Sequence, residues 1–121
     1  MCNIFNFTGY RSVSIQRSVQ ALTVLLEQKP DLIFLDLVMP ITNGYELCSQ
    51  IRRVSLFQET PIIILTGNDG VIDRVRAKMA GASDFMSKPI EKEKIVSVIN
   101  KYLGNQQNSV ATNNSLVEIK V

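Results

Sequence analysis

Apolar residues in this chain fall into two patterns, short continuous runs and longer stretches where they recur every three or four positions. The runs are clearest at Leu32–Asp36 and Ile62–Thr66, where four large apolar residues precede one polar residue. A strand without polar alternation is buried on both faces, which is typical of parallel sheets flanked by helices. Because such strands alternate with stretches of helical spacing, the sequence predicts an α/β fold with a parallel sheet and right-handed crossovers.

The expected elements end at residues that stop helices or turn the chain. Pro30 stops the first helix because proline disfavours helix in the residue before it, and Gly81 ends a later helix as a C-cap. The helix before Gly81 is expected to turn Ile72, Val75 and Met79 to one side. We expect strands at Tyr10–Gln16, Leu32–Asp36, Ile62–Thr66 and Asp84–Ser87, and helices at Ser18–Gln28, Glu46–Arg53, Val71–Met79 and Glu91–Leu103.

The composition changes after the last expected helix. Residues 105–115 are dominated by Gln, Asn, Ser and Thr without periodicity, which indicates a polar linker. Leu116–Val121 then returns to apolar and polar alternation, so a disordered tail and an added edge strand both stay open. The expected organisation is one domain over residues 1–104 and a linker with a C-terminal tail over residues 105–121.

Length and charge limit the function classes. With 121 residues and 45% apolar residues the chain is long enough for one core. A net charge of +2 is too weak to predict direct nucleic-acid binding. No apolar stretch approaches the roughly 20 residues that span a bilayer, and no secretory signal is visible, so we expect a cytoplasmic protein. Cys2 and Cys48 are interpreted as reduced thiols.

The absence of histidine excludes several kinds of site. It removes Ser-His-Asp and Cys-His nucleophile systems, most zinc sites and any phospho-histidine relay role. The polar residues that remain as candidates follow the predicted strands: Asp36, Thr66 and Lys88. The ligand crevice of a parallel sheet lies at the carboxyl ends of its strands, so these three side chains are expected to form a cluster able to hold a phosphoryl group.

In this order, the motifs resemble the receiver domain of two-component response regulators from about Gly9 to Leu103. The resemblance rests on Asp36 with Met39-Pro40 and Gly44, on the run from Ile63 to Gly67, on Gly81–Phe85, and on Lys88-Pro89. The spacing among these motifs is the specific feature, because each motif alone is weak. In detail, the sequence over Lys29–Gly44 and Thr66–Ala82 is most similar to receivers of the cyanobacterial PatA type. The resemblance implies a flavodoxin-like (CheY-like) fold.

The resemblance also implies a role for each matching residue. Asp36 would be the phosphoacceptor, attacking a phospho-histidine or a small acyl phosphate. Lys88 would pair with Asp36 and then with a phosphoryl oxygen, and Thr66 would turn its hydroxyl to the new phosphoryl group. Phe85 stands at the position of the family's aromatic switch. Asp36 and the backbone carbonyl of Val38 would be Mg²⁺ ligands. The implied partner is a sensor histidine kinase or a phosphotransfer protein, and the implied function is signalling rather than enzymatic.

The chain departs from the family at its beginning. A complete receiver opens with a central strand that ends in two or three magnesium-binding carboxylates, followed by a first helix. Residues 1–7 here resemble the last turns of that helix, and the first 26 residues contain no Asp or Glu. Mg²⁺ is held by one or two carboxylates with phosphate and water. We therefore expect an N-terminally truncated receiver in which Mg²⁺ binding is weak or absent and phosphotransfer is impaired.

The missing strand would lie between Val13–Ile15 and Leu32–Leu35, and unpaired buried backbone groups cost on the order of 1–3 kcal/mol each. The gap could be closed by the N-terminal strand moving across, by Leu116–Val121 inserting, or by a strand from a partner chain. Because Glu118 and Lys120 count against a buried central position, we favour a four-stranded remnant that is marginally stable or forms a homodimer.

Three alternatives concern function. The chain could be a binding module that acts without phosphorylation, with a partner surface on the Val71–Met79 helix and the elements after it, including Arg76, Lys78, Ile90 and Tyr102. It could also be a fragment without function. A flavin-binding protein or an aspartate-based phosphatase is disfavoured, because no phosphate loop follows a first strand and Val38 stands where the phosphatase needs a second Asp.

Overall fold

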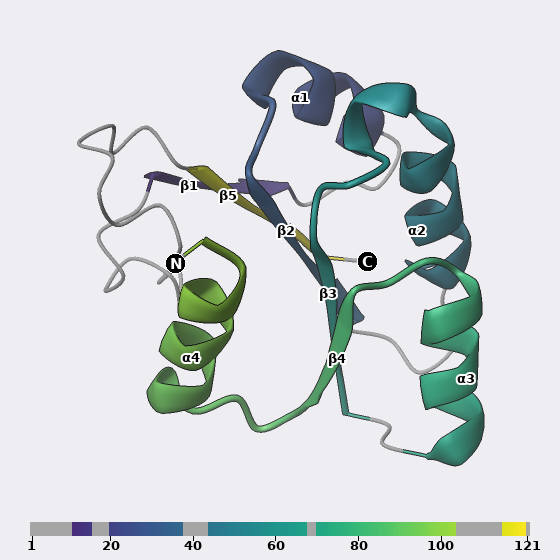
Figure 1. Ribbon diagram of the computed structural model, residues 1–121, viewed down its shortest axis with the longest axis vertical. Helices are drawn as coiled ribbons and strands as arrows, with labels where there is room; N and C mark the ends of the chain where they lie inside the picture. Colours follow the sequence, from purple (N-terminus) through teal and green to yellow (C-terminus); the bar gives the residue numbers. More distant parts are fainter. Residues whose placement is uncertain (1–10, 16–19, 38–43, 68–69, 104–114, 121) are drawn as a thin grey trace.

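The computed structural model describes residues 11–15, 20–37, 44–67, 70–103 and 115–120 (Figure 1). Strands alternate with α-helices along the chain, as the sequence pattern predicts, and one short 3₁₀ helix follows the second α-helix. None of the helices within the described ranges is long and apolar enough to cross a membrane. The elements are β1 (Arg11–Ile15), α1 (Ala21–Gln28), β2 (Leu32–Leu37), α2 (Gly44–Arg53), the short 3₁₀ helix η3 (Ser55–Phe57), β3 (Ile62–Thr66), α3 (Val71–Met79), β4 (Asp84–Ser87), α4 (Lys92–Leu103) and β5 (Ser115–Lys120).

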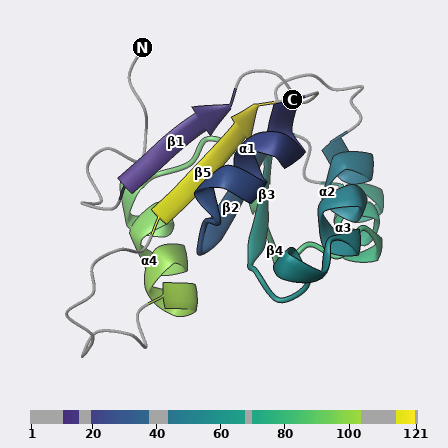
Figure 2. The same cartoon turned by 90° about the horizontal axis from the view of Figure 1, so that it is seen from above.

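All neighbouring strands pair in parallel in one sheet of order β1-β5-β2-β3-β4. Figure 2 shows β5 lying alongside β1 and β2, in the middle of the sheet rather than at its edge. The observed fold is the expected α/β, flavodoxin-like arrangement of a parallel sheet with flanking helices.

The four-stranded remnant that the sequence favours is wrong, because β5 inserts between β1 and β2. The segment 105–121 is therefore not a tail throughout, since Ser115–Lys120 is part of the sheet. Glu118 counted against this position, yet it is only 2% exposed. One buried carboxylate costs less than the backbone groups that two facing strand edges would leave unpaired, at roughly 1–3 kcal/mol each.

Helices cover the two faces of the sheet unequally (Figure 1). On one face, α1, α2 and α3 contribute Leu25, Ile51 and Ala77 to a cluster with the odd-numbered residues of β2 and β5. On the other face, α4 packs Ile95, Ile99 and Leu103 against Leu32, Phe34 and Leu116. Alternation along β2 and β5 thus sends successive side chains to opposite clusters.

The apolar side of α3 does not enter the core. Val71, Ile72, Val75 and Met79 are between 50% and 81% exposed, and Ala77 is the buried residue of this helix. An apolar stripe at helical spacing normally marks the core-facing side of a helix. Here the stripe faces outward, and the small Ala77 allows α3 to approach the sheet closely.

Two helix ends follow the sequence signals. Lys29 ends α1 in the left-handed conformation with φ 48°, and its N–H donates to the Leu25 carbonyl. Gly81 follows α3 with φ +95°, a conformation in which a side chain is strained, and the Arg52 side chain lies where a Cβ would project. The predicted start of the first helix at Ser18 lies outside the described residues.

Candidate functional site

Asp36 is the penultimate residue of β2, at the carboxyl end of a strand with four buried apolar residues before it. β2 is surrounded by β5 and β3, so the backbone of Asp36 is held by pairing on both sides. The side chain is 13% exposed. A carboxylate at this position is thus fixed by the sheet and open to solvent on a small part of its surface.

Lys88 forms an ion pair with Asp36, with 2.5 Å between Lys88 Nζ and Asp36 Oδ1. It follows β4, two strands away, and its side chain is 33% exposed. Asp36 Oδ1 is buried and has no partner with hydrogen-bond geometry, so the contact with Lys88 is mainly electrostatic. The pair places one cation directly on one carboxylate oxygen.

Thr66 ends β3, the strand between Asp36 and Lys88. Leu65 is the register partner of Asp36, and Thr66 is the register partner of Leu37. The carbonyl of Thr66 accepts a hydrogen bond of 2.8 Å from the Lys88 N–H. This bond fixes the start of the β4–α4 connection and therefore the point from which the Lys88 side chain reaches Asp36.

Phe85 lies in β4 opposite Ile64 and packs against the core cluster below α1, α2 and α3. The guanidinium carbon of Arg74, on α3, lies 5.1 Å from the centre of the Phe85 ring, within the range of a cation–π contact. Phe85 is partly buried, and Arg74 covers its ring from the side of α3. Val38, the expected carbonyl ligand, lies outside the described residues.

The described residues gather no large set of metal ligands. They contain no group of three or more His, Cys, Asp or Glu side chains able to hold a metal. The residue of β5 in register with Asp36 is Lys120, a basic residue. Mg²⁺ requires near-octahedral oxygen ligands. Asp36 supplies carboxylate oxygens of that kind, but Lys88, a cation, already pairs with one of them.

The comparison with known families decides what this arrangement is. The sequence matches the family described as the response regulator receiver domain over residues 1–100. The chain belongs to the response regulator receiver family. Receivers of this family interact in general with histidine kinases or phosphotransfer proteins.

Two curated relatives of this receiver illustrate the match. Protein PilG of Pseudomonas aeruginosa is 32% identical over 83 residues, which are 69% of this chain and 62% of PilG. Response regulator MprA of Mycobacterium sp. (strain KMS) is 37% identical over 92 residues, 76% of this chain and 39% of MprA. The receiver thus spans less than two thirds of the length of either relative.

Two solved structures share its fold. The receiver domain of a signal transduction histidine kinase from Syntrophus aciditrophicus has a TM-score of 0.72 at 30% identity, covering 89% of this chain and 82% of that one. The receiver domain of a sensor histidine kinase from Pseudomonas aeruginosa PAO1 has a TM-score of 0.73 at 28% identity, covering 84% and 83%. The latter holds a magnesium ion coordinated in its active-site cleft.

Arg52 of α2 organises the opposite edge of the receiver, where β3 and β4 begin. It donates hydrogen bonds to the carbonyls of Phe57, Thr60 and Gly81, with distances of 2.8, 2.6 and 2.7 Å, and another of 3.0 Å to Ser83 Oγ. Burial lowers the pKa of Arg52. Sequence reasoning missed this residue, because its partners are mainly backbone carbonyls, which leave no pattern in the sequence.

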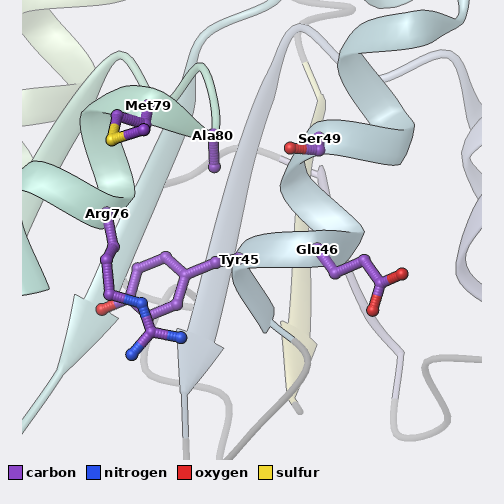
Figure 3. Close-up of a pocket in the computed structure, with 6 residues that line it drawn as sticks. All are labelled: Tyr45, Glu46, Ser49, Arg76, Met79 and Ala80. Atoms are coloured by element: carbon purple, nitrogen blue, oxygen red, sulfur yellow. The ribbon is translucent and has the colours of Figure 1, made fainter.

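A shallow pocket of about 250 Å³ lies between α2 and α3 (Figure 3). Arg76 and Tyr45 face one another in it, with 4.8 Å between the guanidinium carbon and the ring centre, while the Glu46 side chain points away. Burial raises the pKa of Tyr45, Asp73 raises it further, and Arg76 lowers it. The pocket is separate from the Asp36–Lys88 pair, since neither residue lines it.

Proposed function

We propose that this receiver accepts a phosphoryl group on Asp36. A carboxylate oxygen attacks the phosphorus of a phospho-histidine or a small acyl phosphate. The P–O bond to Asp36 forms as the bond to the leaving imidazole or carboxylate breaks, and Asp36 becomes an acyl phosphate. The observation that carries the proposal is the 2.5 Å contact between Asp36 and Lys88 at the carboxyl ends of the strands.

The neighbouring residues support this step by position and charge. Phosphoryl transfer depends mostly on positioning and on neutralising charge. Lys88 exchanges its contact with the carboxylate for one with a phosphoryl oxygen, and Thr66 offers its hydroxyl to another. Phe85 responds as the aromatic switch. Since Arg74 covers its ring, a rotation of Phe85 changes the position of Arg74 on the surface of α3.

The transfer is impaired relative to a complete receiver. Among the described residues Asp36 is not part of a group of three or more metal-ligating side chains, and Lys120 is its register partner in the neighbouring strand. A phosphoryl group adds close to two negative charges. With Lys88 as the neutralising group and a poor metal site, phosphorylation of Asp36 is slow.

The proposed partners are a sensor histidine kinase or a phosphotransfer protein in the cytoplasm. The domain acts as a signalling receiver and not as an enzyme, and direct binding to nucleic acid or membrane is not part of the proposal. The narrower likeness to PatA-type receivers and the N-terminal truncation stay predictions.

Phosphorylation by acetyl phosphate tests the proposal. The full chain is incubated with acetyl phosphate and excess Mg²⁺, and the modified fraction is followed by intact mass and phosphate-affinity electrophoresis. We expect a slow addition of one phosphoryl group that is lost in Asp36→Asn. Glu93→Gln, which removes an exposed carboxylate on α4, is the matched control and should be modified like the native chain. Modification that persists in Asp36→Asn contradicts the assignment.

The second candidate, a binding module that acts without phosphorylation, is favoured by the exposed apolar stripe on α3. Of the other contacts proposed from sequence, Arg76 stacks on Tyr45, and the Tyr102 hydroxyl donates to the Ser83 carbonyl at 3.2 Å. Titration with beryllium fluoride and Mg²⁺, observed by NMR, separates the two functions. Shifts at Thr66 and Phe85 that vanish in Asp36→Asn support the receiver, whereas an unchanged spectrum supports the module.

A further inference from the structure

The space between β1 and β2 is a slot the width of one strand. β5 fills it and pairs in parallel with both neighbours, from Ser115 opposite Arg11 to Lys120 opposite Asp36. Leu116, Val117 and Ile119 are fully buried there. Without β5, the facing edges of β1 and β2 would leave their backbone groups unpaired. The slot therefore has a strong requirement for a parallel strand.

The strand in the slot is separable from the rest of the domain. β5 lies outside residues 1–100, which match the receiver family. Its packing involves β1, β2, α1 and, through Leu116, α4, and its connection to α4 consists of residues 104–114. These eleven residues can span at most about 36–40 Å when extended. That reach is about the diameter of a domain of this size, so β5 can reach a slot in an adjacent molecule.

One residue of the strand in the slot carries a charge. Glu118, 2% exposed, lies opposite Phe34 on one side and Ser14 on the other. Removing a carboxylate from water costs free energy that a partner offsets only in good geometry, so Glu118 adds less to the stability of β5 than an apolar residue would. The β5 of a second copy has the same residues and can therefore repeat every one of these contacts, Glu118 included.

We propose that the slot between β1 and β2 accepts β5 from a second copy of this chain, giving a dimer by reciprocal strand exchange. Each copy has one slot and one strand, so the exchange closes in a pair with two-fold symmetry and leaves no slot empty. The contacts within the sheet are the same in the single chain and in the dimer. The balance between the two forms is then set by protein concentration and by the connection.

Cysteine trapping tests this proposal. Val13 and Val117 are register partners, and neighbouring strands are about 4.8 Å apart, within the Cα range of a disulfide. Full chains carrying Val13→Cys or Val117→Cys, each with Cys2→Ser, are unfolded together in urea, refolded at high concentration and oxidised. A chain with both substitutions shows whether the link can form. Leu56→Cys, at an exposed position, replaces Val13→Cys in the control mixture.

We expect a 13–117 link between chains, a doubling of the mass in light scattering, and little 56–117 link. The result should be unchanged without a phosphodonor and in an Asp36→Asn background, so its failure is distinct from failure of phosphorylation. A single-chain mass at every concentration, with 13–117 links no more frequent than 56–117 links, overturns the proposal. A dimer without the 13–117 link also overturns it, because that dimer uses another surface.

Discussion

Asp36 of β2 and Lys120 of β5 are register partners in neighbouring parallel strands. The family resemblance implies an opening strand with magnesium-binding carboxylates between β1 and β2. In the structure β5 lies between β1 and β2, and it places a basic residue, Lys120, in register with Asp36. The insertion of β5 thus pairs the facing edges of β1 and β2 and places a basic rather than an acidic residue in register with Asp36.

Lys120→Asp should increase Mg²⁺ affinity by about tenfold or more, which corresponds to about 1.4 kcal/mol. The substitution places a second carboxylate at the strand position in register with Asp36 and removes a positive charge there. Calorimetric titration with MgCl₂ measures the change. Lys94→Asp, the same charge change at an exposed position on α4, should leave the affinity near that of the native chain. Equal gains in both variants would mean that net charge alone is responsible.

Lys88→Ala should lower the free energy of unfolding by about 1 kcal/mol, because Asp36 Oδ1 loses its partner while remaining buried. The effect is modest since Lys88 is partly exposed. Asp36→Asn in the Lys88→Ala background should recover most of the loss, because the amide carries no charge. Urea unfolding of the native chain, both single variants and the double variant gives the coupling between the two residues. A coupling of zero would show that the ion pair does not contribute to stability.

Arg52→Ala should destabilise the fold by roughly 2–4 kcal/mol, since several carbonyls and Ser83 lose a charged donor at once. Arg52→Lys should recover little of this loss, because an ammonium group cannot match the planar fork of the guanidinium. Arg53→Ala removes the adjacent, exposed arginine and should change stability by less than about 0.5 kcal/mol. Thermal or urea unfolding of the three variants is sufficient. Similar losses for Arg52→Ala and Arg53→Ala would contradict the role of Arg52.

We expect the Cys48 thiol to lower the free energy of unfolding as the pH rises from 9 to 11. Burial raises the pKa of this thiol from 9.0 to about 11, so in this window the unfolded chain releases a proton that the folded chain keeps. The folded chain therefore binds more protons, and the free energy of unfolding decreases with pH by up to about 1.4 kcal/mol per unit. Below pH 9 the contribution is fully present. Cys48→Ala, compared by urea unfolding across the same pH range, should show a shallower decrease. Parallel slopes would mean that the thiol does not titrate as proposed.

The elements that the sequence predicts well are those whose signal is local. Ile62–Thr66, Val71–Met79 and Asp84–Ser87 coincide with β3, α3 and β4. Their apolar pattern and their stop signals, such as Gly81, lie within the segment itself. The approach of Lys88 to Asp36 was also expected, since parallel strands bring their carboxyl ends to one edge.

The features that sequence reasoning missed depend on distant parts of the chain. Leu116–Val121 enters the sheet because β1 and β2 would otherwise leave backbone groups unpaired along their facing edges. Glu118, taken alone, predicts an exposed position, although it is buried. The outward apolar stripe of α3 is likewise invisible locally, because its spacing equals that of a core-facing stripe.

The place of β5 in the chain order bears on biosynthesis. β1 and β2 leave the ribosome early, but the strand that joins them ends at Lys120. At 5–20 residues per second, the synthesis of β5 is complete about 4 to 17 s after that of β2. During that interval two strand edges and a row of apolar side chains are open to solvent. The nascent chain is then at its greatest risk of aggregation, and we expect binding by chaperones to be most important in those seconds.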